Sequence, residues 1–175
     1  MAELLRFRSL FNQQVLHTLG TLEHVPISLW QAVPADSNTN YLGERVNRIT
    51  IEALVRHLCQ AEQHWANALA ETKPGQAIAP PASVTAADEV APGVPLLQHY
   101  RATHETTLVR IQGFDEGRLA TELVFAGRRF TVMGFLWAVY GHHAYHFGQI
   151  DLLLRQQGHM PPEFLEYAEM ANVIA

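Results

Sequence analysis

Apolar residues recur at three- and four-residue steps in four long stretches of this 175-residue chain, and this is the spacing of amphipathic α-helices. The expected helices span residues 3–24, 50–71, 96–112 and 131–158. Thr50 is the expected N-cap of the second helix, and Gly158 is the expected end of the fourth. Because almost no stretch shows the alternation of a strand, the pattern predicts an all-α protein, specifically a four-helix bundle.

The connections between these helices add to the prediction. Residues 73–95 hold five of the nine prolines, and we expect this long connection to cross from one end of the bundle to the other. Two neighbouring helices would then run parallel. The sequence ELVFAGRRFTV is expected to form a hairpin around Ala126 and Gly127, and a short C-terminal helix is expected from Glu163 to about Asn172.

Composition excludes several classes of protein. With 48% hydrophobic residues the chain can bury a substantial core, so we expect one domain over residues 1–175. A net charge of -5 without a run of basic residues disfavours nucleic acid as a partner. No apolar run has the length of a membrane span or the position of a signal peptide, which predicts a cytoplasmic protein. The single cysteine, Cys59, excludes an intrachain disulfide and a zinc site built from cysteines.

Three of the ten histidines fall within five residues, in GHHAYHFGQIDLLLRQQG. His142 and His146 are four apart and share one helix face, whereas His143 is turned about 100° from His142. A chain this rich in histidine contains H-x-x-x-H by chance about once in two cases, so the pair alone carries little weight. Both members nevertheless fall in the apolar stripe of the helix, where two imidazoles need either separate partners or one shared ion.

The second helix offers a third ligand. His57 and His64 flank its apolar stripe seven positions apart, and either could reach the fourth helix. Three neutral imidazoles leave coordination positions open, as catalytic metal sites do. An H-E-x-x-H protease is disfavoured because His143 stands where the glutamate is needed. A di-iron carboxylate bundle is disfavoured because the chain contains no E-x-x-H.

Two longer motifs carry a family resemblance: HLCQAEQHW in the second helix, and TVMGFLWAVYGHHAYHFGQIDLLLRQQG followed by PP. The second contains H-x-x-x-H-x-G-Q, then aliphatic residues and R-Q-x-G. With these motifs the chain resembles the DinB/YfiT-like family of metal-dependent four-helix proteins. The resemblance implies that His57, His142 and His146 are metal ligands. Phe147 stands where the family usually has a polar or basic residue, which implies a more apolar pocket mouth here.

The resemblance implies metal-assisted chemistry on a small molecule. Its characterised members resemble transferases or isomerases that use a low-molecular-weight thiol such as bacillithiol or mycothiol, so this is the first hypothesis. A metal-assisted hydrolase is the alternative within the same class. A non-catalytic metal-binding stress or interaction protein is the rival from another class. The expected metal is divalent, with zinc or nickel ahead of iron.

Two further sets of residues complete the expectations. His64, Tyr145 and Glu62 lie near the edges of the stripes and are candidate proton carriers, and the alternative for each is a solvated or packing residue. Four apolar residues fall outside the core stripe of the fourth helix: Leu136, Trp137, Phe147 and Leu154. They predict either the face of a homodimer or a surface covered by the C-terminal helix.

Overall fold

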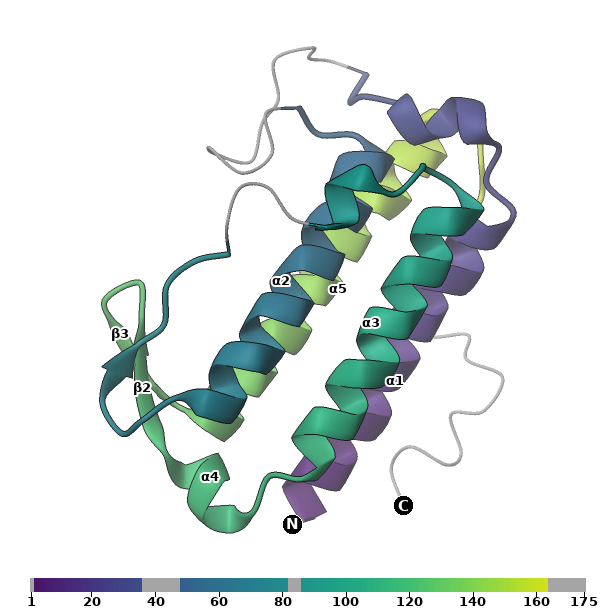
Figure 1. Ribbon diagram of the computed structural model, residues 1–175. Helices are drawn as coiled ribbons and strands as arrows, with labels where there is room; N and C mark the ends of the chain where they lie inside the picture. The colour runs from purple at the N-terminus through teal and green to yellow at the C-terminus, as the bar shows by residue number, and fades with distance from the viewer. Residues whose placement is uncertain (1, 36–47, 82–85, 164–175) are drawn as a thin grey trace.

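A computed structural model describes residues 2–35, 48–81 and 86–163, and its long helices lie side by side (Figure 1). They are α1 (Ala2–Glu23), α2 (Ile51–Glu71), α3 (Val94–Gln112) and α5 (Val132–Gln156). The smaller elements are η1 (Ile27–Gln31), β1 (Gln76–Ala77), η3 (Ala86–Glu89), α4 (Glu116–Ala120), β2 (Glu122–Phe125) and β3 (Arg128–Thr131). The predicted four-helix bundle is confirmed. The expected C-terminal helix falls almost entirely outside the described residues.

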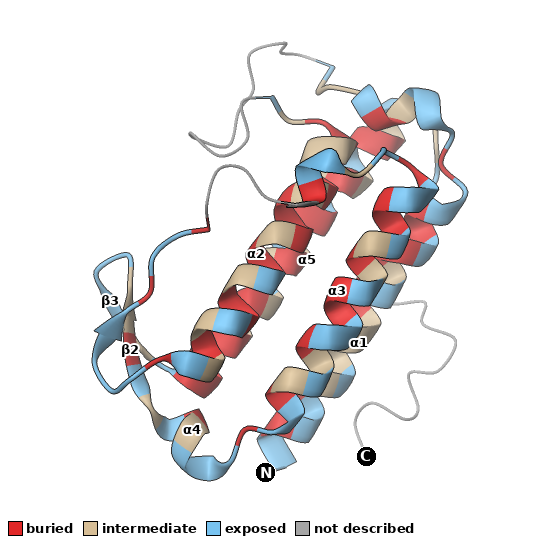
Figure 2. Ribbon diagram, viewed as in Figure 1, coloured by how far each residue is buried: buried red, intermediate tan, exposed pale blue. Residues whose placement is uncertain are grey.

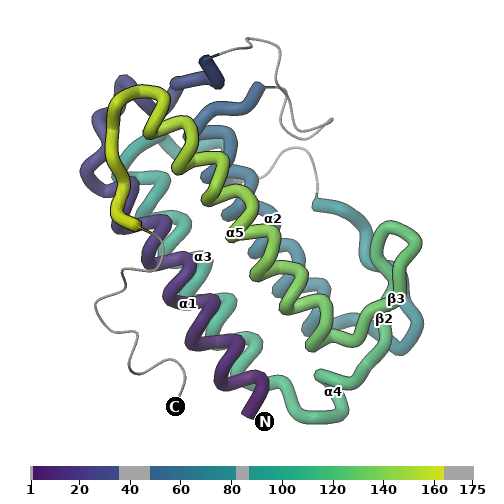
Figure 3. Tube along the Cα trace, turned by 180° about the vertical axis from the view of Figure 1, so that it is seen from behind, coloured from purple at the N-terminus to yellow at the C-terminus, as the bar shows by residue number. Residues whose placement is uncertain are grey.

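The four long helices pack as a square. α1 contacts α3 and α5, and α2 contacts the same two helices. The chain leaves the end of α2, crosses back along the bundle and enters α3 from the same end as α2, so α2 and α3 run parallel as predicted (Figures 1 and 3). Within the part of the chain that the structure describes, no helix is both long enough and apolar enough to cross a bilayer.

Local signals account for where the helices begin and end. The side chain of Thr50 accepts a hydrogen bond from the backbone N–H of Ala53, which confirms it as the N-cap of α2. Thr131 does the same for α5 by accepting from the N–H of Gly134. Past the end of α5, Gly158 has a φ of 75°, a left-handed conformation that glycine adopts without steric cost.

The predicted hairpin is present and belongs to a three-stranded sheet. β2 and β3 pair in antiparallel register, with Phe125 opposite Arg128 across a two-residue turn. The turn residues Ala126 and Gly127 have φ values of 48° and 74°, as a primed hairpin turn requires. β1, from the crossover, adds a parallel strand beside β2. It was not predicted, because two residues are too few to show an alternating pattern.

The core contains more of α5 than the apolar stripe predicted (Figure 2). Leu136, Phe147 and Leu154 are 3%, 4% and 0% exposed, and Trp137 is half-buried. The expectation that these residues lie outside the core is therefore wrong for Leu136, Phe147 and Leu154. The reason is that α5 packs against both α1 and α2, so that two of its sides are covered. These residues accordingly give no support to a homodimer face.

Candidate metal centre

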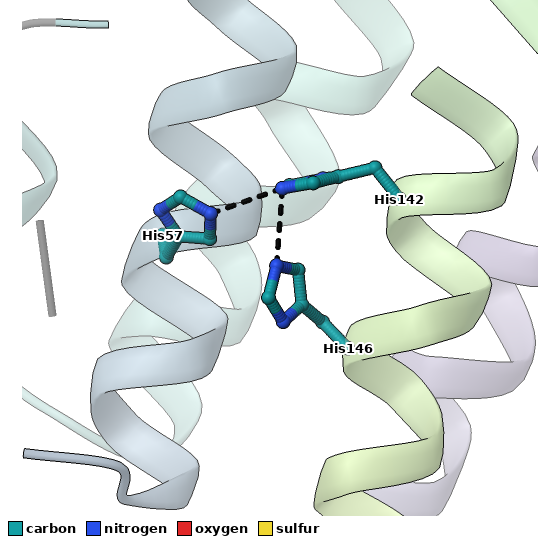
Figure 4. A group of neighbouring side chains, drawn as sticks. All are labelled: His57, His142 and His146. Carbon is teal, nitrogen blue, oxygen red and sulfur yellow. Dashed lines mark hydrogen bonds between the residues drawn. The ribbon is translucent and has the colours of Figure 1, made fainter. Parts of the chain in front are cut away.

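The structure brings together the three histidines that the family resemblance singled out. His57 projects from α2, and His142 and His146 project from α5, so that their rings point toward one another (Figure 4). Nε2 of His142 lies 3.0 Å from Nε2 of His57 and 3.0 Å from Nε2 of His146. One nitrogen from each ring lies within 4.8 Å of the other two.

Helix geometry explains this convergence. The four-residue step stacks His142 above His146 on the face of α5 that packs against α2. His57 lies across that contact, on the facing side of α2. His57 and His146 are 8% and 4% exposed, whereas His142 is half-buried. The cluster is thus shielded from solvent at His57 and His146 and accessible at His142.

The donor set fits a divalent cation. Each imidazole nitrogen carries either one hydrogen or one lone pair in the ring plane, so Nε2 of His142 can form only one well-aligned hydrogen bond with its two neighbouring nitrogens. A cation between the rings would face a lone pair from each of them. Three imidazoles are a normal donor set for zinc or nickel.

A hydrogen bond orients the ring of His146 for this role. Nδ1 of His146 donates to Oε1 of Gln149 over 2.7 Å, which places the remaining lone pair on Nε2, the atom that faces the cluster. Burial lowers the pKa of His146, although the Gln149 hydrogen bond opposes that effect. The ring is therefore neutral at pH 7, as a metal ligand must be.

A second polar cluster, which the sequence did not predict, joins all four long helices. Oε1 of Glu62 on α2 lies 2.8 Å from Nδ1 of His104 on α3, and Oε2 lies 3.1 Å from Nε2 of His143 on α5. Nε2 of His104 lies 3.3 Å from Oδ1 of Asn12 on α1. The sequence signals were the position of Glu62 near the edge of its stripe and that of His104 among the apolar residues of its helix. We call these four residues the Glu62 network.

The charge of Glu62 is held inside this network. Glu62 is 1% exposed, and burial alone would raise the pKa of its carboxyl. Hydrogen bonds from His104 and His143, together with the charges of those two residues, outweigh burial and lower the pKa from 4.5 to about 2. Both carboxylate oxygens are occupied, so Glu62 is placed to hold the helices together rather than to carry a proton at the three-histidine cluster.

The other two candidate proton carriers lie in different surroundings. His64 donates from Nε2 to the carbonyl oxygen of Ala79 in the crossover, at 2.8 Å, and does not belong to the three-histidine cluster. Tyr145 is 60% exposed, its ring centroid lies 5.0 Å from that of His146, and its hydroxyl oxygen accepts from Nε2 of Gln149 at 3.3 Å. Of the three candidate proton carriers, Tyr145 is therefore the one that contacts the three-histidine cluster.

The cysteine of the chain is not a nucleophile at this site. Cys59 is buried, and its Sγ donates to Oγ1 of Thr103 at 3.4 Å. Burial raises the pKa of its thiol to about 11, an effect that the Thr103 hydrogen bond only partly offsets and the charge of Glu62 reinforces. The thiol stays protonated at neutral pH, so any thiolate chemistry needs a thiol from outside the chain.

A cavity of about 350 Å³ opens beside the cluster, between the β2–β3 hairpin and the α2–α5 pair. We call it the hairpin cavity. Its lining residues are Trp65 on α2, Phe125, Ala126, Arg128 and Phe130 on the hairpin, and Phe135, Ala138, Val139 and His142 on α5. His142 is the member of the three-histidine cluster that reaches this cavity, which gives a small molecule a route to the histidines.

Comparisons with known proteins find a matching family and solved structures with the same fold. The sequence model of the DinB family matches residues 27–172, whereas no curated protein matches the chain. The crystal structure of YjoA, a DinB-like protein from Bacillus subtilis, has a TM-score of 0.64 at 20% identity, over 90% of this chain and 95% of that one. YfiT from Bacillus subtilis, described as a probable metal-dependent hydrolase with an unusual four-helix bundle topology, has a TM-score of 0.69 at 14% identity, over 87% and 86%. Both solved structures share the fold described above.

Proposed function

This chain belongs to the DinB family, and we propose that it is a metal-dependent enzyme that acts on a small molecule. His57, His142 and His146 would hold a divalent ion, with zinc or nickel favoured by the imidazole donors. The observation that carries the proposal is the convergence of three ring nitrogens beside the hairpin cavity. A closed cluster without a cavity would have favoured a purely structural or storage role.

When bound, such an ion would supply a Lewis acid that lowers the pKa of a thiol or a water molecule. The residues of the chain do the rest. The hydrogen bond to Gln149 holds His146 in the tautomer in which Nε2, the atom that faces the cluster, carries the lone pair. Because His57 and His146 are buried, bulk water does not reach the cluster on their side. The half-buried His142 leaves the cluster open to the hairpin cavity.

Two nucleophiles remain candidates, each with one observation in its favour. Transfer to or from a low-molecular-weight thiol agrees with the donor set, because among the described residues the cluster contains no carboxylate to serve as a general base, and a coordinated thiol needs none. Hydrolysis is favoured by the description of YfiT, which shares this fold. We place thiol transfer first.

The first experiment measures zinc binding by calorimetry on metal-free protein without a histidine tag. Wild-type protein should bind one zinc ion per chain, and His146→Ala should bind at least a hundredfold more weakly because one of three ligands is lost. His64→Ala is the matched control, since His64 lies on α2 seven residues from His57 but outside the cluster. Equal zinc affinity in wild type and His146→Ala would overturn the proposal.

The second experiment separates the two nucleophiles. Zinc-loaded protein is assayed for cleavage of 4-nitrophenyl esters without thiol, and for consumption of a low-molecular-weight thiol in the presence of a small alkyl electrophile. We expect turnover only in the thiol assay, and its loss in His146→Ala. Ester cleavage that needs the metal but no thiol would instead establish the hydrolase.

A further inference from the structure

The hairpin cavity has the size of a site for a small molecule. Its volume is about 350 Å³. Pockets for small ligands start at about 300 Å³. The cavity therefore suits a compact molecule and is too small for a folded partner or a long peptide.

The walls of the hairpin cavity are aromatic. The ring centroid of Trp65 lies 5.9 Å from that of Phe125 and 5.7 Å from that of Phe135, in edge-to-face contact. Phe125 and Phe135 are 5.2 Å apart, and Phe130 lies 5.5 Å from Phe135. Rings packed edge to face make a rigid apolar wall that accepts another flat ring at favourable angles.

The charge at the hairpin cavity is positive. Arg128 lines it, is exposed, and has no carboxylate partner among the described residues. Its neighbour Arg129 is paired with Glu122 across the hairpin and does not line the cavity. Within the described part of the chain, no acidic residue lines the cavity either. An unpaired guanidinium beside an apolar wall is well suited to bind a carboxylate, through charge-assisted hydrogen bonds.

We propose that the hairpin cavity binds the substrate, and that this substrate has an aromatic ring and a carboxylate. The ring lies against the wall formed by Trp65, Phe125 and Phe135, the carboxylate meets Arg128, and the reacting group lies toward His142. The proposal rests on the proposed function for the last part only, because the cavity and its charge do not require a metal.

The test uses the full chain freed of metal, so that binding in the cavity is measured apart from zinc. The probes are 4-phenylbutyrate and its neutral counterpart 4-phenylbutanol, followed by NMR through the indole N–H signals of the three tryptophans. We expect both probes to move the signal of Trp65 and to leave that of Trp30, which does not line the cavity, in place. The butyrate should bind about tenfold more tightly than the alcohol.

Three variants locate the interaction. Arg128→Gln should weaken the butyrate about tenfold without changing the alcohol. Arg129→Gln, one position along the same strand, should change neither. Ala138→Leu fills the cavity from an exposed position on α5 and should weaken both probes at least tenfold.

Three results would overturn the proposal: equal affinity for the two probes, an equal effect of the two arginine variants, or unchanged binding in Ala138→Leu. Failure of the proposed function looks different. If zinc affinity is the same in wild type and His146→Ala but the butyrate binds as expected, the metal assignment is wrong and the cavity assignment stands.

Discussion

Nδ1 of His146 and Oε1 of Gln149 lie 2.7 Å apart, one helical turn from each other on α5. This hydrogen bond determines which nitrogen of His146 is free to bind a metal. Gln149→Ala should therefore weaken zinc binding by about tenfold to a hundredfold, the usual effect of removing the partner of a histidine ligand, with little loss of stability. Calorimetric titration measures the affinity, and Gln63→Ala, an exposed glutamine on α2, is the control. Unchanged affinity in Gln149→Ala would mean that the ring needs no such support.

The Glu62 network should make folding sensitive to acid. The native pKa of about 2 lies below the value of 4.5 expected in the unfolded chain, so the stabilisation is fully present above pH 4.5 and is lost as the pH falls toward 2. The difference corresponds to about 3 kcal/mol. Urea unfolding of wild type and Glu62→Gln at several pH values measures this contribution. The difference between their free energies of unfolding should become smaller as the pH falls from 5 to 3.

A control separates this effect from the general response to acid. Glu71→Gln changes an exposed carboxylate at the end of the same helix, and its stability should follow that of wild type throughout. Zinc affinity at pH 7 should survive in Glu62→Gln, provided the variant folds, because Glu62 lies outside the three-histidine cluster. If the free energies of unfolding of wild type and Glu62→Gln differ by a constant amount across this pH range, the network as described is contradicted.

Cys59 should be inert in the folded protein. Its thiol is buried and has a pKa of about 11, so at pH 8 almost none is present as reactive thiolate. Ellman's reagent should react with wild type only after guanidinium unfolds it. Ser9→Cys adds an exposed thiol on α1 and should react at once with one equivalent. Rapid reaction of native wild-type protein would show that the environment of Cys59 opens readily.

In the hairpin turn, one substitution should stabilise the protein, and a substitution at the next residue should destabilise it. Ala126 has a φ of 48°, a left-handed conformation that disfavours alanine and that asparagine adopts more easily. Ala126→Asn should raise the free energy of unfolding by roughly 0.5 to 1 kcal/mol. Gly127→Ala, where φ is 74°, should lower it by a similar amount or more. Urea midpoints compare the three proteins, and a loss of stability in Ala126→Asn would be the contrary result.

Much of the bundle could be predicted because each helix carries its own signals. Periodicity, the N-cap at Thr50 and the glycine at 158 are local, so they could be interpreted without knowing the neighbours. The same holds for His142 and His146, whose shared face follows from four-residue spacing alone. The choice of His57 over His64 came from the family resemblance, since spacing on α2 left both open.

The features that could not be predicted depend on how the helices are turned toward one another. The Glu62 network draws one residue from each of four helices, and no spacing along the chain relates them. The burial of Phe147 and Leu154 depends on α1 covering a second side of α5. The hairpin cavity likewise required knowing where the hairpin lies against the bundle. Such features follow from rotation and packing rather than from a local pattern.

The hairpin cavity has two kinds of wall, and this has a consequence for how such a chain diverges. The histidines belong to two helices whose other residues form the core, so changes there disturb the whole fold. The opposite wall, with Phe125, Arg128 and Phe130, belongs to the β2–β3 hairpin, in which Leu123 alone is buried in the core. Under the proposed function, changes confined to this hairpin can therefore alter which small molecule is bound, while the metal ligands on the two helices stay the same.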